Sequence, residues 1–359
     1  MTPPSPELHR VPLLTEEQIA QFKRDGLLVL PGVLDPELCR QAREQMWEVI
    51  AHFRPSMKRD KPTTWLPFSE EEADSYARPD GGGDPYFFGR GHRLYLRNGA
   101  EQLLLNTAVR SLWTIAEQLL GQGEVVWPDG VDEAGMTTGP CLMTEGVVEG
   151  MESHLGPKSK IWTGEPTGRT EQLRLPRTGP TWMTAQGARG LYCTLPHSPS
   201  PIDNYRGAHS EAMYDTRWRL QIAAYVDDLP PRGGGLTLWP RSHCRIWDYW
   251  EAIHRDAPPP QRAAGTPEWN GYTAPPLPAI KADTQPVETH GPVGSVVLWH
   301  ASLLHMAGQN ELTDVIRQAT IYAFAKTAKS VPDEIVKRDP HRGLWRDWSD
   351  QVRCIAAAS

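Results

Sequence analysis

The order in which helix-like and strand-like segments follow one another most constrains the fold of this chain. The regular elements predicted within residues 13–121 are mostly helices, whereas those predicted within residues 188–326 are short β-like runs separated by turns. The 34 Pro and 31 Gly residues divide the chain into short strands and long loops. Strands and helices do not alternate in βαβ units, so a parallel doubly wound sheet is not expected. The sequence predicts a mainly β fold with a helical buttress, whose core is a double-stranded β-helix of the jelly-roll, cupin-like kind.

A chain of 359 residues can form one large domain, and 39% hydrophobic residues are enough to bury a sizeable core. The segment over about 122–187, rich in Gly, Thr and Pro, is long for a connection in a compact domain, and it is either a functional lid or binding loop or an insertion at the edge of the fold. We expect one domain over residues 1–359, with a helical N-terminal part at about 13–121, a loop-rich insertion at about 122–187, the jelly-roll core at about 188–326 with an insertion at about 251–290, and a C-terminal extension over 327–359.

Charge and cysteine usage narrow the class of partner and the compartment. The 44 acidic and 37 basic residues give a net charge of −7 without long blocks of one sign, which argues against nucleic acid or an anionic membrane as the main partner. The five cysteines include no CxxC pair, as is typical of thiols in a reducing compartment. No segment has the roughly 18 apolar residues of a membrane span, and no signal-like stretch opens the chain. We therefore expect a cytoplasmic protein that binds a small molecule, and the sequence does not indicate its oligomeric state.

Local capping signals define the first helices. Thr15, followed three residues later by Gln18, forms a capping box, and Gly26 ends the helix that it opens. The apolar run 27–30 is a predicted strand, and Asp35, followed by Pro, opens a second helix. The other predicted elements are a loop over 54–103, a helix over 104–120, and strands at 191–195, 219–226, 236–239, 295–299 and 318–324.

A histidine and an acid two residues apart, His209 and Glu211, form the first candidate for a metal site. Composition alone predicts about 1.5 such pairs by chance, and the chain holds a second at His254 and Asp256. The first pair precedes a convincing strand, whereas the second runs into three consecutive prolines, where a rigid site is hard to build. Residues i and i+2 of an extended strand point to the same face. His209 and Glu211 can therefore reach one metal ion. Because the second pair runs into the prolines, His254 is expected to be a surface residue.

A third ligand must come from another strand, and His305 is the best candidate. It follows the apolar run 295–299 and a short turn. His300 ends that run and competes with it; if His300 is the ligand, His305 becomes a core histidine. Two imidazoles and one carboxylate are the ligand set of a mononuclear non-haem iron(II) site. The constellation therefore suggests an oxygenase.

Arg317 stands twelve residues after His305, at the entrance of the apolar strand 318–324. A guanidinium at such a place is costly unless it is paired. A carboxylate of a bound dicarboxylic acid would complete a bidentate, charge-assisted pair. A structural salt bridge to Asp314 or another acid is the alternative. The position of Arg317 after His305 favours a role in binding a ligand.

Three ordered segments of the chain resemble the phytanoyl-CoA dioxygenase family of iron(II)/2-oxoglutarate-dependent oxygenases. The resemblance covers the ends of the chain and the predicted barrel, but little of residues 54–187 or 251–290. Three motifs in the same order are much more specific than any one of them. The segments are Leu14–Gln18 with Asp25–Leu34, then Leu220–Asp228 with Gly233–His243, and finally Gly294–Asn310 with Arg317.

The resemblance implies a role for each candidate residue. Iron(II) would be bound by His209, Glu211 and His305. Arg317 would hold the far carboxylate of 2-oxoglutarate, and dioxygen would be the other cosubstrate. Because the family's ligand is the later histidine of such a segment, the resemblance favours His305 over His300.

The chain departs from the family pattern at two positions. Glu211 stands where the family usually has Asp, although clavaminate-synthase-like oxygenases are similar in using Glu, and we expect metal binding to survive the change. Ala307 stands where a hydroxyl residue often helps to hold the cosubstrate, so another donor, Thr237, is expected to take that part. His243 matches a structural turn of the family rather than a ligand.

Together these inferences predict an Fe(II)/2-oxoglutarate-dependent dioxygenase. It is expected to hydroxylate a C–H bond of a small organic molecule of secondary metabolism, with release of succinate and carbon dioxide. Desaturation, epoxidation and ring formation start from the same hydrogen abstraction and are not distinguished by the sequence. Two alternatives remain: a non-catalytic jelly-roll protein that binds a metal or a ligand, and a zinc hydrolase that uses the same three ligands.

Overall fold

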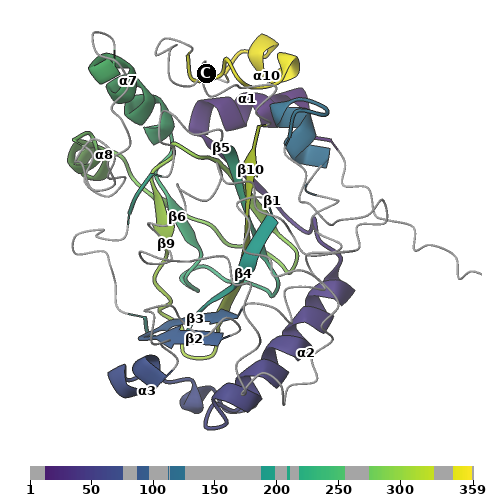
Figure 1. Ribbon diagram of the computed structural model, residues 1–359, viewed down its shortest axis with the longest axis vertical. Helices are drawn as coiled ribbons and strands as arrows, with labels where there is room; N and C mark the ends of the chain where they lie inside the picture. The colour runs from purple at the N-terminus through teal and green to yellow at the C-terminus, as the bar shows by residue number, and fades with distance from the viewer. Residues whose placement is uncertain are drawn as a thin grey trace, which may run out of the picture.

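The structure, a computed structural model, describes residues 13–75, 87–96, 112, 114–125, 187–198, 208–210, 218–254, 275–326 and 343–357. Within these ranges, two antiparallel β-sheets lie between helices (Figure 1). Most of the predicted 122–187 insertion and residues 255–274 of the second insertion lie outside the described residues. The predicted division of the chain into parts therefore stays a prediction.

Seven strands of the described residues form the larger sheet, and every neighbouring pair is antiparallel. Three short strands form a smaller sheet, and His209 adds one further antiparallel bridge to it. In spatial order the larger sheet runs β1 (Leu27–Leu30), β8 (Val296–His300), β5 (Trp218–Tyr225), β10 (Arg317–Ala325), β4 (Gly187–Thr194), β3 (Arg93–Leu96) and β2 (Phe87–Arg90), and the smaller sheet runs β7 (Val287–Glu288), β6 (Leu236–Leu238) and β9 (His305–Ala307).

The two N-terminal helices begin and end where their capping residues predict. α1 (Glu16–Asp25) has both halves of the capping box, and Gly26 ends it in the left-handed conformation at φ 74°. α2 (Pro36–Phe53) begins after Asp35, whose side chain accepts a hydrogen bond from the backbone N–H of Glu37. Both helices bury apolar side chains in the core cluster that covers the outer face of the larger sheet.

Several elements occupy residues that the sequence did not assign to them. The hairpin of β2 and β3 lies within the expected 54–103 loop and adds two strands to the edge of the larger sheet, so that prediction is wrong there. α7 (Ser242–His254) and α8 (Leu277–Asp283) cover the outer face of the smaller sheet (Figure 1). The remaining helical residues are η1 (Pro62–Thr64), α3 (Glu70–Ser75), residues 112 and 114–120, and α10 (Asp350–Cys354).

Alternation along the strands gives the larger sheet two apolar faces. Successive side chains point to opposite faces, so Leu298 of β8 packs outward toward the helices, whereas Val297 and Trp299 point inward. The inward residues share one core cluster with Leu236 and Leu238 of the smaller sheet. The two sheets therefore face each other across a common apolar core.

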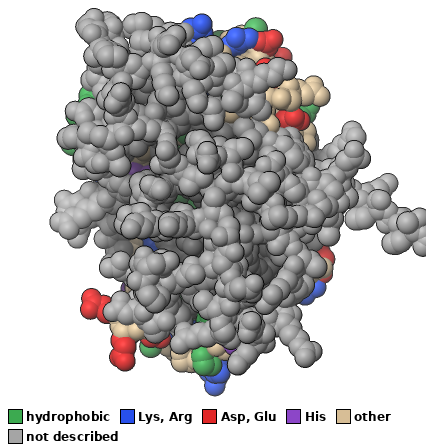
Figure 2. Space-filling model, in the orientation of Figure 1, with side chains coloured by type: hydrophobic (Ala, Val, Ile, Leu, Met, Phe, Trp, Pro, Cys, Tyr) green, Lys and Arg blue, Asp and Glu red, His purple; other side chains and the backbone are tan. Residues whose placement is uncertain are grey.

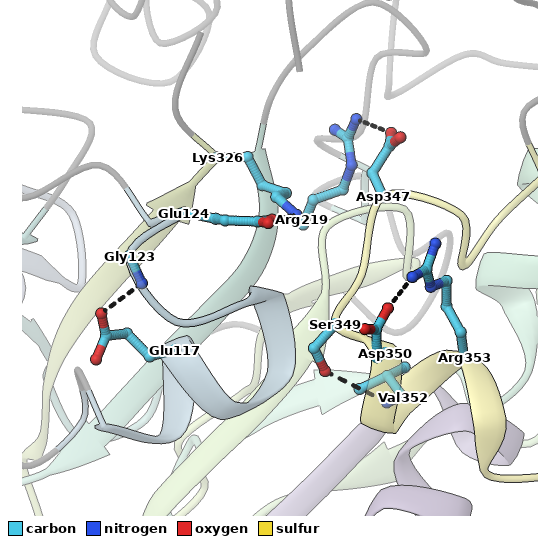
Figure 3. A network of polar contacts seen from close by, with 10 residues as sticks. All are labelled: Glu117, Gly123, Glu124, Arg219, Lys326, Asp347, Ser349, Asp350, Val352 and Arg353. Atoms are coloured by element: carbon cyan, nitrogen blue, oxygen red, sulfur yellow. Dashed lines mark hydrogen bonds and ion pairs between the residues drawn. The ribbon is translucent and has the colours of Figure 1, made fainter. Parts of the chain in front are cut away.

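Buried polar contacts fasten the last described segment of the chain to the larger sheet and to α1. Lys23 Nζ donates to the carbonyl oxygen of Val352 at 2.7 Å and to that of Ile355, and so satisfies carbonyl groups at the end of α10. Arg219 of β5 forms an ion pair with Asp347 at 2.7 Å, with side-chain exposures of 4% and 12% (Figure 3). The C-terminal segment is thus an integral layer of the fold.

Two buried histidines lie between α1, β8 and this C-terminal segment. His243 Nε2 donates to the carbonyl oxygen of Lys23 at 3.1 Å, and His300 Nδ1 accepts the backbone N–H of Ser302 at 3.0 Å. The His300 ring stacks on Trp348 with centroids 5.3 Å apart. Burial lowers the pKa of His243 to about 4 and holds the pKa of His300 well below its ordinary value. Both imidazoles are therefore neutral at neutral pH.

The described surface carries charges of both signs. In Figure 2, acidic and basic side chains occur at both ends of the described surface. The exposed large apolar residues of the described chain are scattered singly, at Leu13, Leu66 and Val287. Among the described residues, no helix combines the length and the apolar character needed to cross a bilayer.

The free energy of unfolding is expected to fall as the pH decreases from about 6.5 to about 4. The unfolded chain binds protons on its histidines near pH 6.5, whereas burial of His243 and His300 keeps their pKa values lower in the folded chain. Each histidine then contributes a slope of up to about 1.4 kcal/mol per pH unit, with the full stability present above about pH 6.5. Urea unfolding at a series of pH values measures this slope.

His243→Gln is the matched control for this experiment. The Gln amide can still donate to the Lys23 carbonyl, but it does not titrate, so the variant should lose one histidine's share of the slope. The nearest charged groups are Asp25 beside His243 and Arg219 beside His300. An unchanged slope in the variant would show that His243 is not one of the titrating groups.

Candidate metal centre

His209 and His305 lie directly opposite each other as an antiparallel pair. Each backbone N–H donates to the carbonyl oxygen of the other residue at 2.9 Å. The side chains of such a pair project to the same face, and the two imidazole centroids are 4.4 Å apart. One backbone contact therefore brings together two histidines that are far apart in the sequence.

The surrounding backbone determines the orientation and the tautomer of His305. Its Nδ1 lies 2.8 Å from the carbonyl oxygen of Leu303, which can only accept, so Nδ1 carries the proton. Nε2 then keeps its lone pair, and metal-binding histidines are typically held in this way. Ser210 Oγ donates to the carbonyl oxygen of Ser302 at 3.0 Å and fastens the segment next to His209 to the turn before His305.

The geometry of the pair suits a single metal ion. Metal–nitrogen bonds to histidine are about 2.1 Å long, so two rings whose centroids are 4.4 Å apart can reach one ion. His305 is buried, whereas His209 is partly exposed. Among the described residues, no group of three His, Cys, Asp or Glu side chains is close enough to hold a metal. Glu211 lies outside the described residues, and its role as a third ligand stays a prediction.

His300, the competing candidate, points away from this pair. It is paired in register with Leu220 on β5, whose side chain belongs to the outer core of the larger sheet. Its ring lies 5.5 Å from that of His243 and stacks on Trp348. The structure therefore places His305, and not His300, beside His209. His254 ends α7, and its side chain lies outside the described part of the chain, so its expected place on the surface stays a prediction.

Arg317 opens β10 and is 3% exposed. Its Nη2 donates to Oγ1 of Thr194, its register partner on β4, at 2.7 Å. Arg317 shares a face of β10 with Ala319, which belongs to the core between the sheets. Burial raises the pKa of Tyr225 in that core, and the positive charge of Arg317 opposes this effect. Arg317 and His305 therefore point into the same space from opposite sheets.

The salt bridge to Asp314, which was the alternative role for Arg317, is not formed between these two described residues. The side chain of Asp314 is exposed. Thr194 is a site residue that the sequence did not reveal. Its importance depends on the register between β4 and β10, which brings it opposite Arg317, and nothing in the sequence around Thr194 indicates that register.

Thr237 lies on the opposite face of the smaller sheet from the histidine pair. Leu238 is the register partner of His305, and Thr237 is the register partner of Met306. Because neighbouring residues of a strand alternate between faces, Thr237 projects with Met306 toward the core cluster under α7 and α8. The structure does not bring Thr237 to the site, contrary to the expected contact with a cosubstrate.

Tyr225 joins the two sheets by hydrogen bonds close to the site. Its hydroxyl accepts the backbone N–H of Leu236 on β6 at 2.8 Å and lies 2.6 Å from Oγ1 of Thr289. Thr289 Oγ1 in turn donates to the carbonyl oxygen of Leu236 at 3.0 Å. This network, inside an otherwise apolar core, holds the sheets at a constant separation.

Comparison with known proteins finds no matching family profile and no matching curated protein.

Similarity in three dimensions is found to solved structures of low sequence identity. SnoK, a non-heme alpha ketoglutarate dependent carbocyclase from nogalamycin biosynthesis, is 13% identical with a TM-score of 0.42, over 87% of this chain and 84% of that chain. The epimerase SnoN in complex with Fe3+, alpha ketoglutarate and nogalamycin RO is 16% identical with a TM-score of 0.39, over 86% and 82%. EctD from S. alaskensis with 2-oxoglutarate and 5-hydroxyectoine is 14% identical with a TM-score of 0.40, over 95% and 91%. Similarity at this level does not establish a family or an activity for the chain.

Proposed function

We propose that this protein is an Fe(II)/2-oxoglutarate-dependent dioxygenase that oxidises a C–H bond of a small organic molecule. The observation that carries the proposal is the paired arrangement of His209 and His305, with Nδ1 of His305 held by a backbone carbonyl. A buried guanidinium, that of Arg317, points into the same space from the facing sheet. A zinc hydrolase or a simple metal binder has no need of this guanidinium.

The metal ligands would be His209, His305 and Glu211. Two imidazoles and one carboxylate leave open positions on iron(II) for other ligands. With 2-oxoglutarate and dioxygen bound, the iron supplies the oxidising power that breaks a substrate C–H bond, with succinate and carbon dioxide as the other products. The hydrogen bond from His305 to Leu303 fixes the ring so that Nε2 points consistently at one position.

Arg317 would hold the far carboxylate of 2-oxoglutarate. Its burial strengthens a charge-assisted hydrogen bond because little water competes for the guanidinium. Thr194 Oγ1 accepts from Nη2 and so limits the rotamers of the arginine before any ligand binds. Preorganisation of this kind reduces the entropy lost on binding.

The apolar core between the sheets would exclude water from the reacting atoms. We further propose that the two sheets form a double-stranded β-helix within a single domain, that hydroxylation is the reaction, and that the substrate is a molecule of secondary metabolism. The facing sheets, with their ligand pair on the smaller one, support the proposed architecture.

Anaerobic titration with iron(II) tests the metal centre. The wild-type protein should bind about one equivalent, and His209→Ala, His305→Ala and Glu211→Ala should each weaken binding by on the order of 100-fold or more, because even partners behind the ligands contribute 10- to 100-fold. His290→Ala, which removes an exposed histidine, is the control and should bind as the wild type does. Stoichiometric binding by both His→Ala variants would exclude this centre.

Addition of 2-oxoglutarate to the anaerobic iron(II) protein tests the oxygenase hypothesis. A metal-to-ligand charge-transfer band should appear in the visible spectrum of the wild type and be absent from His209→Ala. Arg317→Met should weaken 2-oxoglutarate binding by on the order of 100-fold, since a hydrogen bond to a charged group contributes about 1.5–3 kcal/mol.

The affinity for oxalate distinguishes a specific role of Arg317 in binding the far carboxylate from a general loss of structure. Oxalate has the chelating end of a 2-oxo acid but no far carboxylate, so its affinity should be the same in Arg317→Met and the wild type. If well-folded wild type shows no visible band with 2-oxoglutarate, the proposed function is wrong. Equal loss of oxalate and 2-oxoglutarate in Arg317→Met would instead assign Arg317 a structural role.

A further inference from the structure

Trp299 lies beside the proposed metal centre, on the inner face of the larger sheet. Its ring centroid is 5.3 Å from that of His305, at an interplanar angle of 53°. Its register partners are Leu27 on β1 and Gln221 on β5, and it is 1% exposed. The indole therefore occupies the space between the sheets, in contact with a proposed metal ligand.

The indole N–H of Trp299 is buried and has no hydrogen-bond partner in the described part of the chain. The cluster that surrounds it includes Leu27, Val297 and Leu303, whose side chains offer no acceptor, and the indole N–H does not donate to the side chain of its register partner Gln221. A buried donor without a partner is unfavourable, and buried donors in folded proteins are normally satisfied. A phenyl ring at this position would supply apolar surface without that disadvantage. A hydrogen-bond acceptor on a bound molecule would explain why this position holds Trp and not Phe.

We propose that Trp299 Nε1–H donates a hydrogen bond to the metal-chelating carboxylate of a 2-oxo acid bound at the His209–His305 centre. This inference rests on the proposed function and deepens it, because Arg317 would contact the far carboxylate and Trp299 the near one. A carboxylate is the acceptor that a lone donor in an apolar core favours most, since a charged partner strengthens the bond and the low local dielectric strengthens it further. Contact between the Trp299 and His305 rings places the indole on the chelating side of the ligand.

Binding of oxalate to the metal-loaded protein tests the proposal without turnover. Trp299→Phe keeps an aromatic ring and removes the N–H, so its affinities for oxalate and for 2-oxoglutarate should both fall about tenfold in anaerobic calorimetry, as expected for loss of one hydrogen bond to a charged group. This pattern differs from that of Arg317→Met, which should affect 2-oxoglutarate alone.

Trp348→Phe is the matched control. Trp348 is 2% exposed, and its indole N–H is also buried without a partner among the described residues, but it lies on the outer side of the larger sheet against His300. Removing that N–H should leave both affinities within about twofold of the wild type. A similar loss in Trp348→Phe would show that the change in affinity reflects general loosening, and would overturn the proposal.

The indole N–H resonance of Trp299 distinguishes a hydrogen bond to the ligand from a purely structural role. Its chemical shift should change on ligand binding only if the N–H donates to the ligand. In zinc-loaded protein labelled with 15N on its 14 Trp residues, one resonance should shift downfield when oxalate is added and should be missing from Trp299→Phe. Zinc suits the experiment because it is d10 and redox-inactive.

The possible failures are distinguishable. If wild type binds metal and oxalate, but Trp299→Phe binds oxalate equally well and no indole resonance moves, the role of Trp299 is wrong and the proposed function stands. If wild type binds no metal, both the proposed function and the role of Trp299 are overturned. Should Trp299→Phe fail to fold, the wild-type spectra decide, because the proposal requires one of the 14 indole resonances to move.

Discussion

The candidate site depends first on the apolar core that the two sheets share. Burial of side chains such as Leu238 and Val297 contributes about 1.5–3 kcal/mol each and holds the sheets face to face. The hydroxyl of Tyr225, bonded to the backbone of β6, adds a directional link at the same interface. Since packing sets the separation of the sheets, His305 on one and Arg317 on the other keep a constant relationship. A ligand that spans them meets a site that is already assembled.

Strand β8 connects the outer layer of the fold to this site, because its two faces contact one each. Its consecutive residues Trp299 and His300 point to opposite faces, so one lies beside His305 and the other lies among the aromatic rings of the C-terminal segment. The ion pair of Arg219 with Asp347 and the contacts of Lys23 hold that segment against the sheet. The outer layer therefore stabilises the position of β8, and with it the inner face on which the proposed ligand contacts depend.

Short sequence motifs correctly predicted the parts of the fold that depend on contacts between residues close in the sequence. The capping box at Thr15 and the cap at Asp35 were correct because each involves residues within one helical turn. The hairpin of β2 and β3 was missed because it is stabilised by pairing with β4, about 100 residues later. The sequence suggested Thr237 as a contact of the cosubstrate without indicating its orientation, because that orientation follows from the register with β9, which its neighbours in sequence do not encode.

Two close histidine pairs within the described part of the chain show what separates a candidate ligand pair from a structural one. The rings of His243 and His300 are 5.5 Å apart, and Nδ1 of His243 packs so closely on the backbone that a Cβ on Gly26 would approach it to 2.4 Å. Burial keeps both rings neutral within an aromatic cluster. The rings of His209 and His305 are closer, at 4.4 Å, and His209 is partly exposed. With Nδ1 of His305 occupied by a carbonyl, its Nε2 keeps a lone pair for a metal, and of these two pairs only this one combines partial exposure with a closer approach of the rings.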